Sequence, residues 1–586
     1  MIDHLAGPGA PAASLALLAW GWPDLFAAVR GWLGWPYVLA TIHVALALAT
    51  SAHVVLFKRD GRAAVAWVGV IWLAPPAVGP LLYFIFGINR IQRRASRLRA
   101  TGASPQDLFE EGAVLQQRRA GADGVTTVRR RAAPADATAH RRRPPSYGAA
   151  AGDRRVEAPG GVAAEQRRPA PGGAAADQRQ PAPGAATADQ RRPAPGGAAT
   201  ADHYGLAALR TCVGNVTGRE LTHGNRVEPL INGDESYPAM LEAIAAAERS
   251  IALSTFIFDH DRAGERFVEA LAAAHERGVT VRVLIDGVGV RYSRPRITRS
   301  LQARGVPFAK FLEPVLPPRS SYLNLRTHRK ILVVDGRVGF TGGLNIREGC
   351  ILELEPDYPV QDMHFRLEGP VVEHLMEDFS VDWEFTTGEL LEGETWYPTL
   401  EAAGSVEARG IAAGPDENFE TVYWTLLGAL SAAEVSVRIT TPYFIPDQTL
   451  IAALNLAALR GVSVEIVLPE HGNLRFVQWA STAQLWQVLI NGCKVFFSPP
   501  PFDHCKLMVV DGEWVFVGSS NWDARSLRLN FEYNVECYDR ALAAEINRII
   551  DDKIAAARPT SYEEINARSR PVKLRDGIVR LAAPYL

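Results

Sequence analysis

The sequence predicts an α/β fold: two homologous domains with mixed β-sheets flanked by helices, related by a pseudo-twofold axis and preceded by an N-terminal transmembrane helical hairpin. Two uncharged apolar segments near the N-terminus predict the hairpin. After Tyr204, apolar strands alternate with amphipathic helices twice over, which is typical of βαβ units. One polar motif recurs at corresponding places in both halves, which indicates a duplication. We therefore divide the chain into a membrane domain, a linker and two α/β domains, at residues 1–100, 101–203, 204–400 and 401–586.

The membrane domain rests on two apolar segments, at about 36–57 and 63–88, that contain no Asp, Glu, Lys or Arg. Each is long enough to cross a hydrocarbon core about 30 Å thick. The five residues between them leave room only for a hairpin of two helices. The alternative is a pair of buried core helices, but these rarely run so long without charge. The second segment contains three prolines that predict a kink: Pro75, Pro76 and Pro80.

Basic residues around the hairpin predict its orientation. Five arginines follow the second segment: Arg90, Arg93, Arg94, Arg97 and Arg99. The loop between the segments has only Lys58, Arg59 and Arg62. Because positive charge stays on the cytoplasmic side, we expect both termini in the cytoplasm.

The linker at 101–203 is dominated by Ala, Gly, Pro and Arg, and a unit of 12 residues such as "DQRRPAPGGAAT" recurs in it. A segment with so few large apolar side chains cannot build a hydrophobic core, and we therefore expect the linker to be disordered. Its arginine clusters are compatible with contact to anionic lipid headgroups. They are equally compatible with a solvated tether, and the sequence does not decide between the two.

Charge and cysteine content narrow the possible functions. Residues 1–200 contain 24 Lys and Arg against 13 Asp and Glu, a net charge of +11, whereas the remainder contains 38 against 51, a net charge of −13. An acidic α/β part argues against nucleic acid as a partner. The five cysteines form no CxxC pair, so we expect a reducing compartment and neither a disulfide framework nor a zinc site.

The repeated motif reads "THRKILVVDGRVGFTGGLN" in the first half and "DHCKLMVVDGEWVFVGSSN" in the second. Its candidate site residues are His328, Lys330, Asp335 and Asn345, and then His504, Lys506, Asp511, Ser519 and Asn521. In a strand, a His and a Lys two residues apart share one face. The Asp-Gly pair is a hairpin turn signal, so each Asn should return towards the His-Lys end. A solvent-exposed surface strand would explain one such motif. It would hardly explain two motifs of identical spacing at corresponding places in the two halves.

Two such His-Lys pairs suit reaction at a phosphodiester. One imidazole attacks phosphorus and forms a phosphohistidine, and the other protonates the leaving alkoxide. The lysines, with Asn345, Asn521 and Ser519, would hold the non-bridging oxygens and do the work of a metal ion. Neither half contains a metal-ligand pattern, so we expect no metal and no cofactor.

Each histidine also needs an acceptor for its second nitrogen. Asp362, 34 residues after His328, and Glu532, 28 residues after His504, are the candidates, although either could be a surface carboxylate. Asp335 and Asp511 lie at the turns, where we expect a structural or electrostatic role, such as pairing with a lysine, rather than proton transfer.

The paired HxKxxxxD motifs resemble the phospholipase D superfamily over nearly all of residues 205–586. With "PLLYFIFGINRIQRR", "HFRLEGPVV" and "TTPYFIPD", the chain is more narrowly similar to bacterial cardiolipin synthases. This resemblance implies two phospholipase D-like domains that move a phosphatidyl group between two phosphatidylglycerol molecules and release glycerol, with phosphatidylethanolamine a donor in some members. It implies His328 as nucleophile and His504 as acid and base. It also implies anionic phospholipids and a bilayer as partners, and a multi-pass protein of the inner membrane with cytoplasmic catalytic domains.

Two other functions use the same residues. A membrane-bound phospholipase D would transfer the phosphatidyl group to water and give phosphatidic acid. A membrane scaffold on an inactive fold would need no intact motif, and both motifs are intact. The acidic second part of the chain disfavours a nuclease, and no oligomeric state is predicted.

Overall fold

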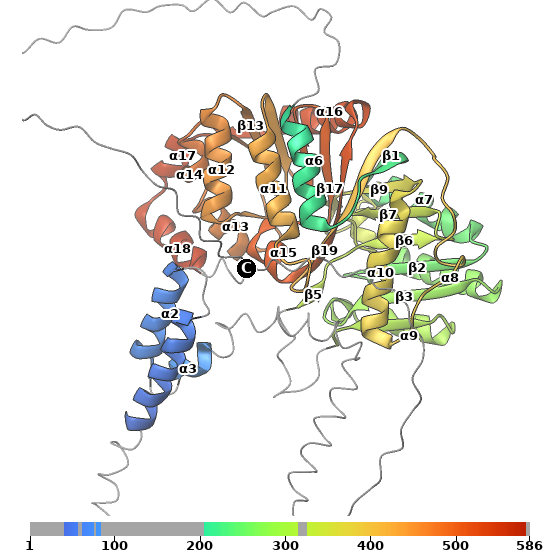
Figure 1. Cartoon of the computed structure of the whole chain (residues 1–586), viewed down its shortest axis with the longest axis horizontal. Helices are drawn as coiled ribbons and strands as arrows, with labels where there is room; N and C mark the ends of the chain where they lie inside the picture. The colour runs from blue at the N-terminus through green and yellow to red at the C-terminus, as the bar shows by residue number, and fades with distance from the viewer. Residues whose placement is uncertain (1–39, 57–60, 76–77, 84–203, 314–324, 582–586) are drawn as a thin grey trace, which may run out of the picture. The chain divides into compact units, whose positions relative to one another are not determined.

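The computed structural model describes residues 40–56, 61–75, 78–83, 204–313 and 325–581 (Figure 1). The predicted linker at 101–203 lies outside the described residues, as do the ends of both predicted membrane segments. The boundaries at 204–400 and 401–586 stay a prediction.

The N-terminal part contains a helical segment at 40–56, then α2 (Gly61–Leu73) and α3 (Val78–Leu82). Residues 40–56 contact α2, because Trp72 Nε1 donates to Ser51 Oγ at 3.1 Å. Where a kinked helix over 63–88 is expected, α2 ends two residues before Pro75 and α3 begins at Val78, and residues 76–77 and 84–88 lie outside the described part of the chain. A proline lacks the N–H that a helix interior needs, and it disfavours helical geometry in the residue before it. Within the described part of the chain, no helix is both long and apolar enough to cross a bilayer.

One sheet of mixed strand direction runs through the α/β part, in the order β20-β14-β13-β11-β16-β17-β19-β10-β1-β9-β7-β6-β2-β3-β4. The first-half strands are β1 (Thr222–Ile231), β2 (Ser250–Thr255), β3 (Thr280–Asp286), β4 (Phe308–Phe311), β6 (Ile331–Val334), β7 (Val338–Gly342) and β9 (Met363–Glu368). The second-half strands are β10 (Val406–Ala413), β11 (Ser436–Thr440), β13 (Ser463–Pro469), β14 (Lys494–Ser498), β16 (Leu507–Val510), β17 (Trp514–Gly518), β19 (Asn530–Tyr538) and β20 (Arg558–Thr560). In Figure 1 the two sets lie side by side, in green to yellow and in orange to red.

The strand order shows the predicted pseudo-twofold relation. Counted outward from the antiparallel β1–β10 pair, the first half runs β1-β9-β7-β6-β2-β3-β4 and the second β10-β19-β17-β16-β11-β13-β14. Strands at equal distance from this pair carry corresponding sequence: β6 and β16 each end in the two valines of a "VVDG" stretch, and each pairs antiparallel with the strand after the turn. The α/β class with a mixed sheet is confirmed.

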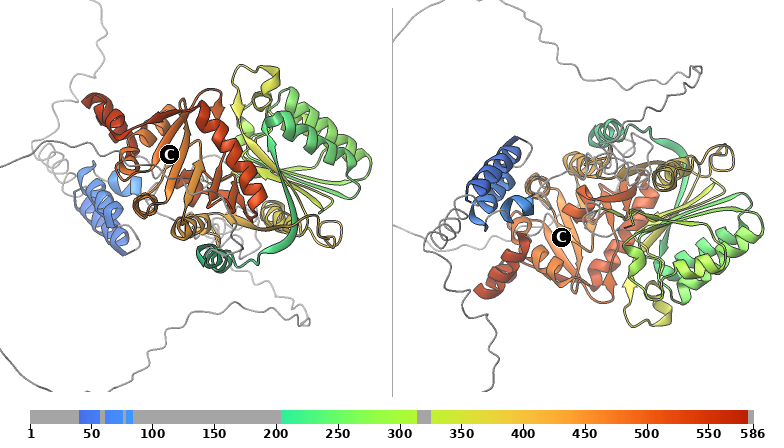
Figure 2. Two further views of the ribbon diagram at one scale, coloured as in Figure 1. Left: turned by 90° about the horizontal axis from the view of Figure 1, so that it is seen from above. Right: turned by 90° about the horizontal axis from the view of Figure 1, so that it is seen from below.

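Helices cover both faces of the sheet, as Figure 2 shows from above and below. In the first half α7 (Asn232–Ala246) and α8 (Arg262–Glu276) pack on one face and α10 (Val371–Thr387) on the other. Successive side chains of a strand point to opposite faces of the sheet. In β2, Ile251 and Leu253 therefore face α7 and α8, while Ala252 faces α10. In the second half, α11 (Thr421–Ala432) and α12 (Gln448–Leu459) correspond to α7 and α8, and α16 (Arg540–Ala556) corresponds to α10.

The two halves share a core and exchange short strands. The central apolar cluster contains Phe379 of the first half and Val535 of the second. Helix α6 (Tyr204–Thr217) packs against α11 of the second half, although it precedes β1 in the chain. Two short strands also cross: β5 (Arg326–Thr327) pairs with β19, and β15 (Phe502–Asp503) pairs with β8 (Val360–Gln361). These crossings position the site.

Candidate active site

Both His-Lys pairs lie where the chain passes from a crossing strand into the central sheet. His328 and Lys330 lie between β5 and β6, and His504 and Lys506 between β15 and β16. The expectation that they lie within a regular strand is wrong. The backbone N–H of His328 donates to Phe531 O at 2.8 Å in the other half, whereas Ile331 already pairs with Ser254 in its own half. The backbone changes partners over these residues and cannot keep one ladder.

Each histidine is held by a buried carboxylate from the opposite half. His328 Nδ1 lies 2.8 Å from Glu532 Oε2, and His504 Nδ1 lies 2.6 Å from Asp362 Oδ2. Both predicted acids are therefore at the site, and each binds the histidine of the opposite half rather than the histidine that it follows in the sequence. The cause is the strand crossing, because β5 lies beside the start of β19 and His504 N donates to Gln361 O at 2.7 Å.

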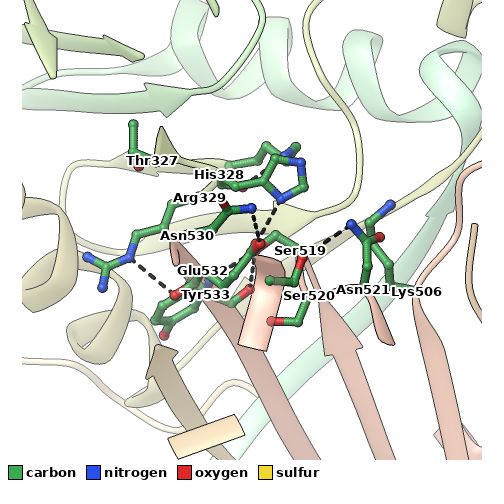
Figure 3. A network of polar contacts seen from close by, with 12 residues as sticks. Thr327, His328, Arg329, Lys506, Ser519, Ser520, Asn521, Asn530, Glu532 and Tyr533 are labelled. Atoms are coloured by element: carbon green, nitrogen blue, oxygen red, sulfur yellow. Dashed lines mark hydrogen bonds and ion pairs between the residues drawn. The ribbon is translucent and has the colours of Figure 1, made fainter. Parts of the chain in front are cut away.

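The carboxylate of Glu532 is the centre of a buried hydrogen-bond network. Figure 3 shows His328, Ser519 and Asn530 converging on it. Ser519 Oγ donates to Oε2 at 2.5 Å, and Asn530 Nδ2 donates to Oε1 at 3.0 Å. The prediction that Ser519 holds a phosphate oxygen is thus corrected, since its hydroxyl proton goes to Glu532. These bonds fix the carboxylate, which in turn fixes the tautomer of His328 and leaves Nε2 for chemistry.

The two acids are accommodated differently. Gly343 corresponds to Ser519, and a Cβ atom at Gly343 would lie 2.2 Å from Asp362 Oδ1. The shorter aspartate therefore needs a glycine beside it. In the second half, the longer glutamate leaves room for a serine that binds it. The small residue and the acid beside it are therefore matched in size. Gly343 lies beside the shorter Asp362, and Ser519 lies beside the longer Glu532.

Burial controls the protonation of the site. It lowers the pKa of His328, although the charge of Glu532 acts in the opposite direction. Burial and then the charge of Lys506 lower the pKa of His504 to about 4. We take both imidazoles as neutral at neutral pH, each donating Nδ1–H to its carboxylate. Despite its burial, Glu532 has a pKa below the usual range, because the protonated form of His328, the hydrogen bond to His328 and the charge of Lys330 stabilise the carboxylate.

The lysines belong to the same centre. Lys330 Nζ donates to His328 O at 2.8 Å, and Lys506 Nζ donates to His504 O and lies 3.0 Å from His504 Nδ1. Burial lowers the pKa of Lys330 to about 7, with the opposing charge of Glu532 next in size. The charge of Lys506 also affects His328, and that of Lys330 affects His504. Because each histidine is also held by a carboxylate of the opposite half, the two pairs form one centre rather than two separate sites.

Aromatic rings wall this centre. Phe256 lies with its centroid 5.3 Å from that of His328, and Phe502 and Tyr443 lie 5.8 and 6.3 Å from His504. Their apolar surfaces exclude water from the imidazoles, which is the physical cause of the lowered pKa values. Tyr443 belongs to the stretch "TTPYFIPD", whose sequence alone indicates no role for this ring.

Asp335 and Asp511 lie at the far end of the hairpins. Asp335 accepts from the backbone N–H groups of Glu248, Arg249 and Ser250 at 2.7–3.2 Å. Asp511 does the same in the second half. These bonds support the expected structural role. The carboxylates bind backbone groups rather than a lysine, because the strands β6 and β16 lie between each aspartate and the lysine of its motif.

The two asparagines lie on the segments that follow β7 and β17. Asn345 Oδ1 accepts from Ile257 N at 3.2 Å, next to Phe256. Asn521 Nδ2 donates to Ser526 Oγ at 3.2 Å and has a second hydrogen available. Both side chains are at least nine-tenths buried, with exposures of 9% and 5%.

Residues that sequence analysis missed hold the His-x-Lys segments in place. Arg329 points away from the site, as Figure 3 shows, and its Nη1 lies 2.8 Å from Asp382 Oδ2 of α10. In the second half Lys553 of α16 binds Asp503, next to His504, at 2.7 Å. Arg329 itself, between His328 and Lys330, was the sequence signal for these contacts, because a buried charged side chain needs a partner of opposite charge. Among the described residues, no cluster of His, Cys, Asp and Glu could hold a metal ion.

A duplicated α/β sheet with a shared His-Lys centre on the pseudo-twofold axis defines the phospholipase D class of proteins. A family model described as "Cardiolipin synthase, PLD-like domain" matches residues 240–383 and 426–554. A second, described as "Phospholipase_D-nuclease N-terminal", matches residues 45–87. The chain belongs to the bacterial cardiolipin synthase family of this superfamily, and it is an enzyme of the phosphatidyltransferase type.

Two relatives carry this assignment. The chain is 36% identical over 367 residues to cardiolipin synthase A of Pseudomonas fluorescens (strain SBW25), which covers 62% of this chain and 75% of the relative. It is 32% identical over 368 residues to the major cardiolipin synthase ClsA of Bacillus subtilis (strain 168), covering 62% and 76%. The crystal structure of phosphatidylserine synthase from Haemophilus influenzae Rd KW20 is similar with a TM-score of 0.51 at 15% identity, over 64% of this chain and 100% of that one. That likeness shows the fold alone.

Proposed function

We propose that this enzyme makes cardiolipin by transferring a phosphatidyl group from one phosphatidylglycerol to another through a phosphohistidine intermediate. The observation that carries this proposal is the geometry of the two histidines. Each donates Nδ1–H to a buried carboxylate, so each presents Nε2 in a centre that also contains two lysines. The names of the relatives support the choice of product.

In the first step, Nε2 of His328 attacks phosphorus and the bond from phosphorus to the glycerol oxygen breaks. Imidazolium His504 donates its proton to the leaving alkoxide, and glycerol departs. Burial depresses the pKa of His504, and the negative charge of the bound phosphodiester raises it again. His328 suits the nucleophile because its carboxylate partner is itself held by Ser519 and Asn530.

In the second step, neutral His504 takes the proton from a glycerol hydroxyl of the second phosphatidylglycerol. The hydroxyl oxygen attacks phosphorus, the bond from phosphorus to His328 Nε2 breaks, and cardiolipin forms. Lys330 and Lys506, with the amides of Asn345 and Asn521, stabilise the charge on the non-bridging oxygens in both transition states.

The N-terminal part is proposed to anchor the enzyme as a multi-pass hairpin in the inner membrane, with domains at 204–400 and 401–586 in the cytoplasm. Its helices expose large apolar side chains such as Leu48, Val55, Val65 and Leu73. Side chains of this kind cover the lipid-facing surface of membrane proteins. The excess of arginine after the second segment supports the orientation.

The test uses the full chain in liposomes that contain phosphatidylglycerol labelled in its headgroup glycerol, without added metal. We expect cardiolipin and free labelled glycerol in equal amounts. Phosphatidic acid in place of cardiolipin would favour the hydrolase. Phosphatidylethanolamine, added in a second arm, tests the donor, because its use would release ethanolamine. His328→Ala and His504→Ala should each abolish turnover, and near wild-type activity in either variant would exclude the shared centre.

A further inference from the structure

An apolar surface remains exposed on the second half, away from the sheet. It is formed by the N-terminal end of α13 (Arg475–Thr482) and by α18 (Arg570–Arg580), which pack against each other. We call it the α13–α18 surface. Its exposed apolar side chains are Leu474 (52%), Phe476 (61%), Leu574 (65%), Ile578 (58%) and Leu581 (78%). Exposed apolar residues that gather on one surface mark a contact with a partner or a membrane.

The exposed apolar residues of α18 and its C-cap share one face of the helix. Leu574, Ile578 and Leu581 follow the spacing of four and three residues that places side chains in a row. The helix is therefore amphipathic with its apolar side turned to solvent. A helix that only completed the core would turn this side inward.

The charged residues around this row are almost all basic. Helix α18 contains Arg570, Lys573, Arg575 and Arg580, and Arg475 lies between Leu474 and Phe476. The one acid in α18, Asp576, is 1% exposed and binds Arg568 at 2.6 Å. The surrounding α/β part is acidic overall, so this concentration of positive charge is local. A basic amphipathic helix fits an interface of anionic headgroups and acyl chains.

Helix α18 is fixed in this orientation. Arg575 places its guanidinium 4.0 Å from the centroid of the Trp479 ring of α13. Val579, on the inner side of α18, packs against a cluster of Ile445, Val477 and Ala480. The exposed row is therefore presented by a packed helix and is not a frayed chain end.

The α13–α18 surface is also connected to the catalytic centre. Tyr443 packs against the same cluster as Val579. Its hydroxyl donates to Asn473 Oδ1 at 2.8 Å, immediately before Leu474, and its ring lies beside His504. One side chain thus separates the surface from the acid and base of the reaction.

We propose that the α13–α18 surface docks on the anionic phospholipid bilayer, with the apolar row in the headgroup and acyl-chain boundary and the basic residues against phosphate groups. Docking turns the His504 side of the centre toward the lipid surface. The inference goes beyond the proposed function, because a tether at the N-terminus alone would leave the α/β part free to face any direction.

The test compares two probe positions in the full chain. Ile578→Cys and, as the control, Tyr358→Cys, which is 81% exposed in the first half, are labelled with an environment-sensitive fluorophore. Both are made in a Cys212→Ser background, since the other four cysteines are buried. The proteins are reconstituted in vesicles of phosphatidylglycerol and phosphatidylcholine that carry nitroxide groups on the acyl chains. We expect quenching at least fivefold stronger at position 578 than at position 358.

Equal quenching at the two positions would overturn the proposal, because it describes a tethered but undocked enzyme. A probe at 578 that is already shielded in detergent would also overturn it and would indicate that another segment or a second copy covers the surface. Arg570→Glu combined with Arg580→Glu should reduce quenching at 578 at least fivefold, and unchanged quenching would contradict the role of charge. Cardiolipin formation measured in the same vesicles separates loss of docking from failure of the proposed activity.

Discussion

Glu532 of the second half holds His328 of the first, with 2.8 Å between Oε2 and Nδ1, although the two residues lie 204 positions apart in the chain. The reciprocal pair joins Asp362 to His504. Each half therefore supplies the imidazole of one pair and the carboxylate of the other. Duplication alone would have given two self-contained sites, whereas the crossing strands β5 and β15 build one site that neither half can complete.

Glu532→Gln should lower kcat by about 10²–10⁴-fold, because the amide no longer enforces the tautomer that presents Nε2 of His328. Substrate binding should change little, so the loss should appear in kcat rather than in KM. The measurement is steady-state cardiolipin formation in phosphatidylglycerol liposomes. Ser519→Ala is the matched control: it removes one of the hydrogen bonds to the carboxylate and should cost less than about tenfold. Equal losses in the two variants would contradict the orienting role of Glu532.

Gly343→Ala should be far more damaging than Ser519→Gly, although both change a small residue at the same place in the motif. A Cβ atom at Gly343 would lie 2.2 Å from Asp362 Oδ1 and would displace the acceptor of His504. A shift of this kind costs about 10²-fold in kcat. Ser519→Gly removes a bond but creates no clash, and it should lose less than about tenfold. Similar activity in both variants would show that Asp362 can move without loss.

The sequence was sufficient for the parts of the site that depend on local pattern. Alternation and turn signals predicted the strands on either side of each Asp-Gly turn, and the repeated spacing identified His328, Lys330, His504 and Lys506. Asp362 and Glu532 were found because carboxylates follow each motif at similar distances. These inferences need only the order of residues along one half.

The sequence was insufficient where the two halves interlock. No local pattern reveals that β5 pairs with β19, since a two-residue strand carries no periodicity, and so the sequence does not predict which histidine each acid binds. Ser519 was assigned to phosphate because its hydroxyl could serve either partner, and only the position of Glu532 decides. The prolines near residue 75 predict the place at which the helix is disturbed. They do not reveal that the helix ends there instead of bending.

Asp335→Ala should destabilise the protein without changing its chemistry. The carboxylate binds three backbone N–H groups at the start of β2, and the residue itself has φ of 53°, a conformation that alanine adopts less readily. We expect a loss of about 1–3 kcal/mol, seen as a lower midpoint of thermal unfolding. The kcat at a temperature well below the midpoint should stay at the wild-type value. Asp335→Asn keeps an acceptor oxygen and tolerates this φ, so it should regain part of the stability. A large fall in kcat in the folded Ala variant would restore a chemical role to Asp335.

The lowered pKa of Lys330 predicts how the rate of the reaction depends on pH. Burial lowers the pKa of its ammonium group to about 7, so the charged form that binds phosphate is lost as pH rises through this value in the free enzyme. The ratio kcat/KM should therefore fall above about pH 7, because it reports groups of the free enzyme. The bound phosphodiester carries negative charge and raises the pKa of Lys330, so kcat should fall only at higher pH. Lys330→Arg keeps its charge at every accessible pH, and its alkaline limb should move upward even where its activity is lower. An alkaline limb that stays in place in Lys330→Arg would mean that another group of the centre titrates there, with Lys506 the next to test by the same substitution.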